Sequence, residues 1–205
     1  MKNFPDEIPI FPLSGVIYFP QTNLPLNIFE QRYLDLVNDA VKKDKLMGMI
    51  QTNKNNNEVY KIGCLGKIID FKKNEDGRIL INLNGITRFE ILKETKNFKL
   101  YREFQVDYEK FKMDLKPEVR ELDTDVLMRK VRSFFKSKGM FLNWKEFDKL
   151  DITQKVNTLA MIAPFTDEEK QKLLESASLK EKADTLEDVI DFYLHEVNYK
   201  NNTIQ

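Results

Sequence analysis

The distribution of glycine and proline divides this sequence into two halves of different character. Six of the seven glycines and five of the seven prolines lie within residues 1–112. The same stretch carries short runs of alternating apolar and polar residues, which is the period of a β-strand, whereas residues 113–205 carry apolar residues at helical spacing. We therefore expect an α+β protein, with a β-rich subdomain over residues 1–112 and a helical bundle over residues 113–205.

The strands of the first half are separated by recognisable turn signals. Asp76-Gly77 is a typical hairpin turn, and Gly63, Gly66 and Gly85 inside apolar runs indicate bulges or bends of the kind found in a small closed barrel. The strands are expected at residues 8–13, 15–19, 45–52, 60–73, 77–94 and 99–111.

Helix-start signals recur along the chain. Asn27 is the expected cap of one helix embedded in the β-rich half, with Glu30 at the matching capping-box position. Thr166 with Glu169 and Ser178 with Glu181 form two further capping boxes. In the second half, helices are expected at residues 117–137, 143–150, 153–163, 166–177 and 178–197.

The composition argues against several classes of function. Lys and Arg total 33 and balance 33 Asp and Glu, whereas general nucleic-acid binders are basic. A single cysteine, Cys64, and a single histidine, His195, supply neither a disulfide framework nor a Cys-rich zinc site. The nearest approach to a phosphate loop, residues 63–67, has the wrong spacing. No apolar run is long enough to cross a membrane. We expect a cytoplasmic protein without a cofactor or metal.

A carboxylate and a guanidinium stand two residues apart in "PLNIFEQRY", at Glu30 and Arg32. Paired charges among aromatic residues indicate either a chemical site or a structural brace. A spacing of two places side chains on different faces of a helix, which favours the brace. We expect Arg32 to pair with a carboxylate elsewhere, and Glu30 to cap its helix and meet a distant arginine, with Arg88 as the candidate.

An apolar loop follows the helix-stopping Gly139. Met140, Phe141 and Trp144 cluster there, in a segment that should run over the surface. The loop is interpreted either as a hydrophobic plug that joins the two halves or as a surface that binds polypeptides. These three residues are the predicted polypeptide-binding residues.

Two blocks of sequence resemble the N-terminal, substrate-binding domain of Lon proteases. The first is "IPIFPLSGVIYFPQTNLPLNIFEQRY", and the second is "GCLGKIIDFKKNEDGRILINLNGITRFEI". The helical tail, with "KQKLLE" at residues 170–175, is similar to the end of the same domain. The matching positions are Phe11-Pro12-Leu13, Pro20, Leu24-Pro25-Leu26, residues 28–33, Gly63, Asp76-Gly77-Arg78, Gly85 and Arg88-Phe89.

The resemblance implies a PUA-like β-barrel with one embedded helix, followed by a helical bundle, and a role in binding polypeptides. The sequence ends at Gln205 without a phosphate loop, so we expect a stand-alone, non-enzymatic member that lacks the ATPase and Ser–Lys peptidase parts of Lon. Its expected partners are unfolded or exposed apolar polypeptide segments, together with a protease or chaperone that it serves as an adaptor or quality-control factor.

Two alternatives remain open. One is RNA binding by the barrel, because residues 98–112 interleave lysines with aromatic residues that could stack on bases. The other is an enzyme whose site has no sequence motif, which a cluster of carboxylates with shifted pKa values would reveal.

Overall fold

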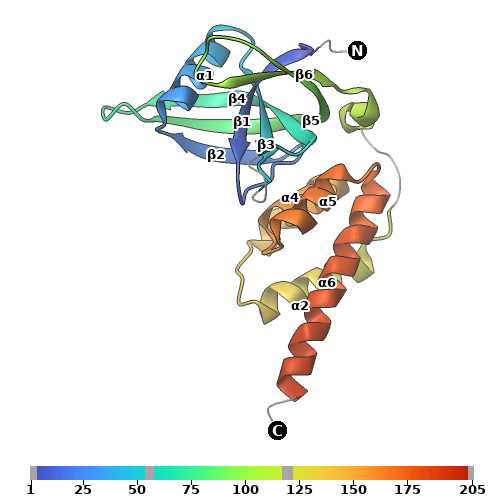
Figure 1. Ribbon diagram of the computed structural model, residues 1–205. Helices are drawn as coiled ribbons and strands as arrows, with labels where there is room; N and C mark the ends of the chain where they lie inside the picture. Colours follow the sequence, from blue (N-terminus) through green and yellow to red (C-terminus); the bar gives the residue numbers. More distant parts are fainter. Residues whose placement is uncertain (1–3, 54–57, 117–121, 203–205) are drawn as a thin grey trace.

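The computed structural model describes residues 4–53, 58–116 and 122–202 (Figure 1). The first half forms strands and one helix: β1 (Glu7–Leu13), β2 (Asn23–Ile28), α1 (Gln31–Lys42), β3 (Leu46–Gln51), β4 (Ile62–Lys73), β5 (Ile79–Thr95), β6 (Arg102–Asp107) and the 3₁₀ helix η1 (Glu109–Leu115). The second half is helical: α2 (Asp125–Ser137), α3 (Trp144–Phe147), α4 (Ile152–Ile162), α5 (Asp167–Glu175) and α6 (Leu179–Asn202). The α+β class expected from the sequence is confirmed.

The strands form one sheet that closes on itself. Their order is β2-β5-β4-β3-β1-β6, and β5 also pairs with β6, so the last five strands make a ring. β5 is 17 residues long, which lets its first half pair with β2 and its end pair with β6. β1 and β3 are parallel, and the other pairs are antiparallel.

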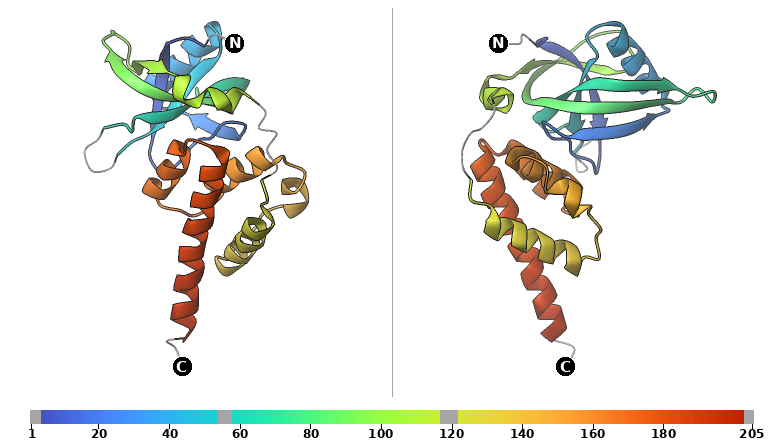
Figure 2. Two further views of the ribbon diagram at one scale, coloured as in Figure 1. Left: turned by 90° about the vertical axis from the view of Figure 1, so that its right-hand side faces the viewer. Right: turned by 180° about the vertical axis from the view of Figure 1, so that it is seen from behind.

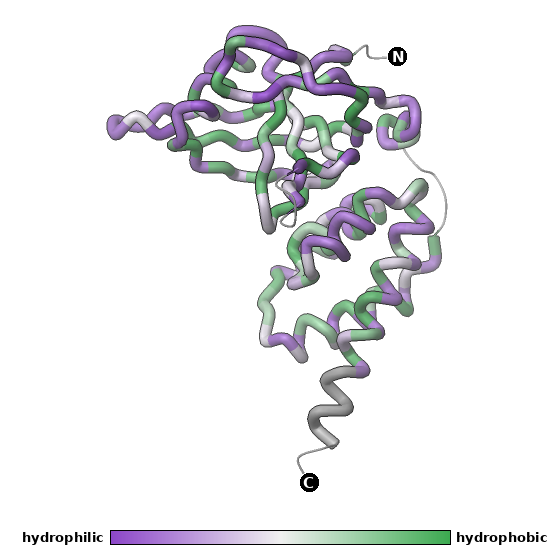
Figure 3. Tube along the Cα trace, in the orientation of Figure 1, coloured by the Kyte–Doolittle hydropathy of each residue, from purple (hydrophilic) through white to green (hydrophobic). Residues whose placement is uncertain are grey.

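Glycines permit this closure at the predicted places. The β4–β5 register shifts beside Gly66, which pairs with Gly85. Gly85 has another role, since the carbonyl oxygen of Phe19 lies 2.2 Å from where a Cβ would stand. At the β4–β5 turn, Gly77 has φ of +86° and its N–H donates to the carbonyl of Asn74. The hairpin expected at Asp76-Gly77 is therefore confirmed, and Figure 3 shows its tip as hydrophilic.

The embedded helix starts later and is capped differently than predicted. Asn27 lies in β2, where it pairs with Leu80, and α1 begins at Gln31 with Glu30 as its N-cap. The Glu30 side chain makes no capping hydrogen bond, so the predicted capping box is wrong. Continuing β2 as far as Ile28 adds two more pairs to the ladder, which outweighs the capping preference of Asn27. The buried face of α1 is Tyr33, Leu36, Val37 and Ala40.

One predicted strand is absent, and one predicted helix is longer than expected. Residues 15–19 are not a strand, although Ile17, Tyr18 and Phe19 are buried. α6 continues to Asn202, beyond the predicted end at residue 197. The predicted helix start at Pro117 lies outside the described residues, and α2 begins at Asp125.

The helical part packs under the barrel and shares a core with it. Val131, Phe134, Leu159 and Leu186 from three helices form one buried cluster. The cluster also contains four residues of the first half: Ile17, Phe19, Ile62 and Phe111. In both views of Figure 2, α6 extends away from the barrel past the other helices. The division at residue 112 remains a prediction, and η1 spans that position.

Candidate functional site

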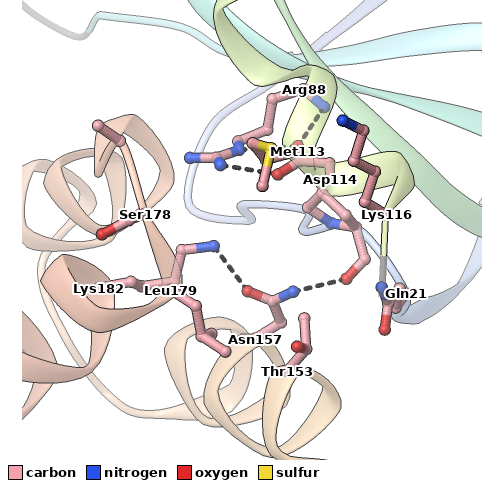
Figure 4. Close-up of a pocket in the computed structure, with 12 residues that line it drawn as sticks. Gln21, Arg88, Met113, Asp114, Lys116, Thr153, Asn157, Ser178, Leu179 and Lys182 are labelled. Atoms are coloured by element: carbon pink, nitrogen blue, oxygen red, sulfur yellow. Dashed lines mark hydrogen bonds and ion pairs between the residues drawn. The ribbon is translucent and has the colours of Figure 1, made fainter. Parts of the chain in front are cut away.

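A buried arginine joins the barrel to the helices (Figure 4). Arg88 of β5 donates from Nε and Nη2 to the two carboxylate oxygens of Asp114 in η1, at 2.9 and 2.7 Å. Its Nη1 donates to the carbonyls of Leu174, at 2.8 Å, and Ser176, at the end of α5. The side chains of Arg88 and Asp114 are only 4% and 10% exposed. The guanidinium also lies 4.2 Å from the ring centroid of Phe111, so this arginine ties together three elements.

A second series of hydrogen bonds crosses the same junction. Lys182 of α6 donates to Oδ1 of Asn157 at 2.7 Å, and Nδ2 of Asn157 donates to the carbonyl of Pro20 at 2.9 Å. Together with Arg88 and Asp114, these residues line a cavity of about 190 Å³ between the barrel and the helices (Figure 4). The side chains of Arg88, Asp114, Asn157 and Lys182 bind one another or backbone carbonyls, which is the arrangement of a structural joint.

The predicted Glu30–Arg88 contact is wrong. Arg32 instead donates to Glu30 itself, from Nε at 3.0 Å and from Nη2 at 2.8 Å. Glu30 precedes the first helical residue, so the rule that separates side chains two apart on a helix does not apply to this pair. Both side chains are about half exposed, so this ion pair contributes little stability.

The predicted apolar loop is partly plug and partly surface. Met140 and Trp144 are half-buried and pack against the helical core. Trp144 makes edge contacts with Phe135 and Phe147, both at 5.7 Å between ring centroids. Phe141, between them in sequence, is 95% exposed. We call Met140, Phe141 and Trp144 the α2–α3 surface.

Basic side chains flank the α2–α3 surface. The carboxylates of Glu146 and Asp148, which follow Trp144 in sequence, already form ion pairs. Glu146 pairs with Lys149 at 2.8 Å, and Asp148 pairs with Arg132 at 2.8 Å. Lys136 and Lys145 are exposed and have no ion-pair partner among the residues that the structure describes. An excess of positive charge therefore borders this apolar surface.

The sequence analysis placed Phe98 in the run of residues 98–112 considered for RNA stacking, but not among the predicted polypeptide-binding residues. Phe98 lies in the connection between β5 and β6 and is fully exposed, as are large parts of Leu92 and Leu100. The sequence was read as a strand from residue 99, whereas β6 begins at Arg102. The signal that could have found Phe98 is an aromatic residue between lysines in a polar run, "ETKNFK".

Cys64 and His195 are the remaining chemical candidates. Cys64 is fully buried, and that burial raises the pKa of its thiol. His195 lies exposed near the end of α6. Across the described ranges, no three His, Cys, Asp or Glu side chains gather as metal ligands. Within the same ranges, no helix has the length and apolar character needed to cross a bilayer.

Comparison with known proteins is consistent with the fold and the sequence motifs. The family model of the ATP-dependent protease La (LON) substrate-binding domain matches residues 7–191. Lon protease of Syntrophus aciditrophicus is 24% identical over 195 residues, which are 87% of this chain and 24% of that protein. Lon protease of Flavobacterium johnsoniae is 30% identical over 96 residues, 44% of this chain and 12% of that protein. The chain thus spans a quarter or less of the length of these curated relatives.

Solved structures show the same fold. A Lon N-terminal domain protein from Xanthomonas campestris superposes with a TM-score of 0.65 at 19% identity, covering 88% of this chain and 96% of that one. The N-terminal domain of Mycobacterium avium complex Lon protease gives 0.62 at 15% identity, covering 90% and 98%. The family model describes a substrate-binding domain and not a catalytic one, and it covers most of this chain. The chain therefore belongs to the family of the ATP-dependent protease La (LON) substrate-binding domain.

Proposed function

We propose that this protein is a non-enzymatic polypeptide-binding module that acts through the α2–α3 surface. The observation that carries the proposal is Phe141, which is 95% exposed beside half-buried Met140 and Trp144. An exposed aromatic side chain beside a supported apolar base is the arrangement of an interaction hot spot. The family assignment supports polypeptides as the ligand class.

The energetics favour transient binding. Full burial of a phenylalanine side chain contributes about 1.5–3 kcal/mol, and association and ordering of an unfolded segment oppose that gain. Weak and reversible capture suits an adaptor or quality-control factor that passes exposed apolar segments to a protease or chaperone. We place this activity in the cytoplasm as part of the same proposal.

The single tryptophan provides a direct assay. Trp144 belongs to the α2–α3 surface and is the chain's only tryptophan, so binding of a tryptophan-free apolar peptide should change its fluorescence. Phe141→Ser should lower the affinity for the peptide by about 10- to 100-fold, which corresponds to losing roughly 1.5–3 kcal/mol of apolar burial. Its fold should be unaffected because Phe141 contributes little to the core.

Phe29→Ser is the matched control. Phe29 is also exposed, at 66%, but lies between β2 and α1. Its substitution should leave peptide affinity unchanged. Equal peptide affinity in wild type and in folded Phe141→Ser would refute the proposed site.

A further inference from the structure

The loop of residues 96–101 between β5 and β6, here the β5–β6 loop, displays an aromatic side chain to solvent. Phe98 has a relative exposure of 109%, the highest among the exposed large hydrophobic residues of the described chain. Leu100, two residues on, is 64% exposed. Isolated exposed apolar residues are common on protein surfaces, so exposure alone does not mark Phe98 as a binding residue. The contacts that hold the β5–β6 loop provide the further evidence.

Hydrogen bonds fix the loop on both sides of Phe98. Nδ2 of Asn97 donates to one carboxylate oxygen of Glu103 at 2.9 Å, and Nζ of Lys99 donates to the other at 2.6 Å. The N–H of Lys99 also donates to Oδ1 of Asn97 at 3.0 Å. Glu103 is buried in β6. Because both neighbours of Phe98 bind one buried carboxylate, the side chain between them is directed outward.

The loop is also anchored to α1. Nζ of Lys99 lies 5.1 Å from the ring centroid of Tyr101, whose hydroxyl donates to Asp39 of α1 at 2.9 Å. A loop ordered before binding has less conformational entropy to lose when a partner covers its side chain. Phe98 is therefore presented in a form ready for contact.

The charges beside Phe98 resemble those beside Phe141. Glu94 already forms an ion pair with Arg102 at 2.7 Å. Lys93 and Lys96 are exposed, and neither has an ion-pair partner within the described part of the chain. Phe98 and Phe141 are thus both flanked by lysines without a bound carboxylate, and this positive charge favours apolar segments that carry acidic residues nearby.

We propose that the β5–β6 loop is a second grip for the same polypeptide, so that one extended client is held at Phe98 and Phe141 together. This inference rests on the proposed function. The client is an unfolded segment with two apolar anchors, each beside acidic residues. Figure 2 shows the β5–β6 turn on the barrel and the α2–α3 connection among the helices, on the two sides of the barrel–helix junction, so a client must be long enough to reach both.

The junction between the barrel and the helices fixes the separation of the two grips. Arg88 and Asn157 cross it, as described above, and Nε2 of Gln171 on α5 donates to the carbonyl of Ile62 on β4 at 3.2 Å. A fixed separation makes binding at the second grip intramolecular after the first has formed, and the gain depends on the length of the client between its anchors.

Synthetic clients of defined length test the inference. Each carries two identical Phe-and-Glu segments joined by Gly/Ser linkers of increasing length, and the control carries one segment in a chain of equal length. We expect no gain for the shortest linkers, a gain of about 10-fold or more at the length that spans the grips, and a slow decline beyond it. A gain independent of linker length would overturn the two-grip model.

Variants separate this inference from the proposed function. Phe98→Ser should reduce the affinity for the best two-segment client to about that for the one-segment control. Phe29→Ser should leave the affinity for both clients unchanged. If Phe98→Ser has no effect while Phe141→Ser weakens the client, the second grip is wrong and the proposed function stands. If Phe141→Ser has no effect, the proposed site fails and the two-grip model fails with it.

A charge exchange tests the specificity. Lys96→Glu should weaken the two-segment client whose segments carry Glu, and should strengthen a client in which Lys replaces those residues. Equal effects on the two clients would contradict the role of charge in the second grip.

Discussion

Replacing Arg88 by methionine tests the junction on which the architecture depends. Methionine can keep the contact with Phe111 but supplies no hydrogen-bond donor. The variant removes both guanidinium donors to the Asp114 carboxylate, which keeps the backbone N–H of residue 88, and it removes the Nη1 donor to the carbonyls of Leu174 and Ser176. The carboxylate has little access to water to compensate, since its side chain is only 10% exposed.

The magnitude follows from these orphaned groups. Removing one partner of a buried ion pair typically costs about 3–5 kcal/mol, because the remaining charge is desolvated and unpaired. Each buried carbonyl that loses its donor adds to that cost. We therefore expect Arg88→Met to lower the free energy of unfolding by at least about 3 kcal/mol. A loss of that size moves a urea midpoint by about 1 M or more.

Urea unfolding followed by circular dichroism measures the loss, and a double-mutant cycle isolates its cause. Asp114→Leu removes the orphaned charge, so the double variant should be more stable than the sum of the two single losses implies. Arg102→Met is the control, because the side chains of its ion pair with Glu94 are 39% and 46% exposed, and such a pair should be worth less than about 1 kcal/mol. The reasoning is refuted if Arg88→Met costs no more than Arg102→Met, or if the cycle shows no coupling.

Two further predictions concern the interior of the barrel. Gly85→Ala should lower the free energy of unfolding by about 1–3 kcal/mol, because its Cβ would lie 2.2 Å from the backbone oxygen of Phe19; an unchanged urea midpoint would contradict this. The Cys64 thiol should react with an aromatic disulfide reagent only as fast as the protein unfolds, because burial raises its pKa and blocks access. The thiol of the unfolded chain ionises at about pH 8.5, whereas the buried thiol stays protonated. The free energy of unfolding should therefore be unaffected by this group below that pH and should decrease as the pH rises above it. Rapid labelling of the folded protein at pH 8 would refute that prediction.

Local signals in the sequence predicted the elements well where one interaction decides the structure. The Thr166–Glu169 capping box is present in both directions, at 3.2 and 2.8 Å, and α5 begins at Asp167. The hairpin at Gly77 likewise follows from a positive φ, which favours glycine. These features depend on residues within a few positions of one another.

The partners of Arg88 are distant in sequence. The side-chain partner of Arg88 is 26 residues away, and its carbonyl partners are 86 and 88 residues away. No periodicity predicts such a pairing, and the Glu30–Arg88 contact expected from the sequence is replaced by the Glu30–Arg32 pair. The display of Phe98 depends on contacts only four to six residues apart, since Glu103 binds Lys99 and Asn97, and no local pattern in the sequence predicts these contacts.

The core shared by the barrel and the helices bears on how far apart the two proposed grips are held. Composition divides the chain near residue 112, yet the helical cluster includes Ile17, Phe19 and Ile62 of the first half as well as Phe111. Apolar contacts of this kind resist separation more strongly than a polar interface of two independently moving domains. We therefore expect the barrel and the helices to move as one body. A client that engages Phe98 and Phe141 then meets a fixed distance, which is why linker length, and not apolar content alone, should decide how tightly it binds.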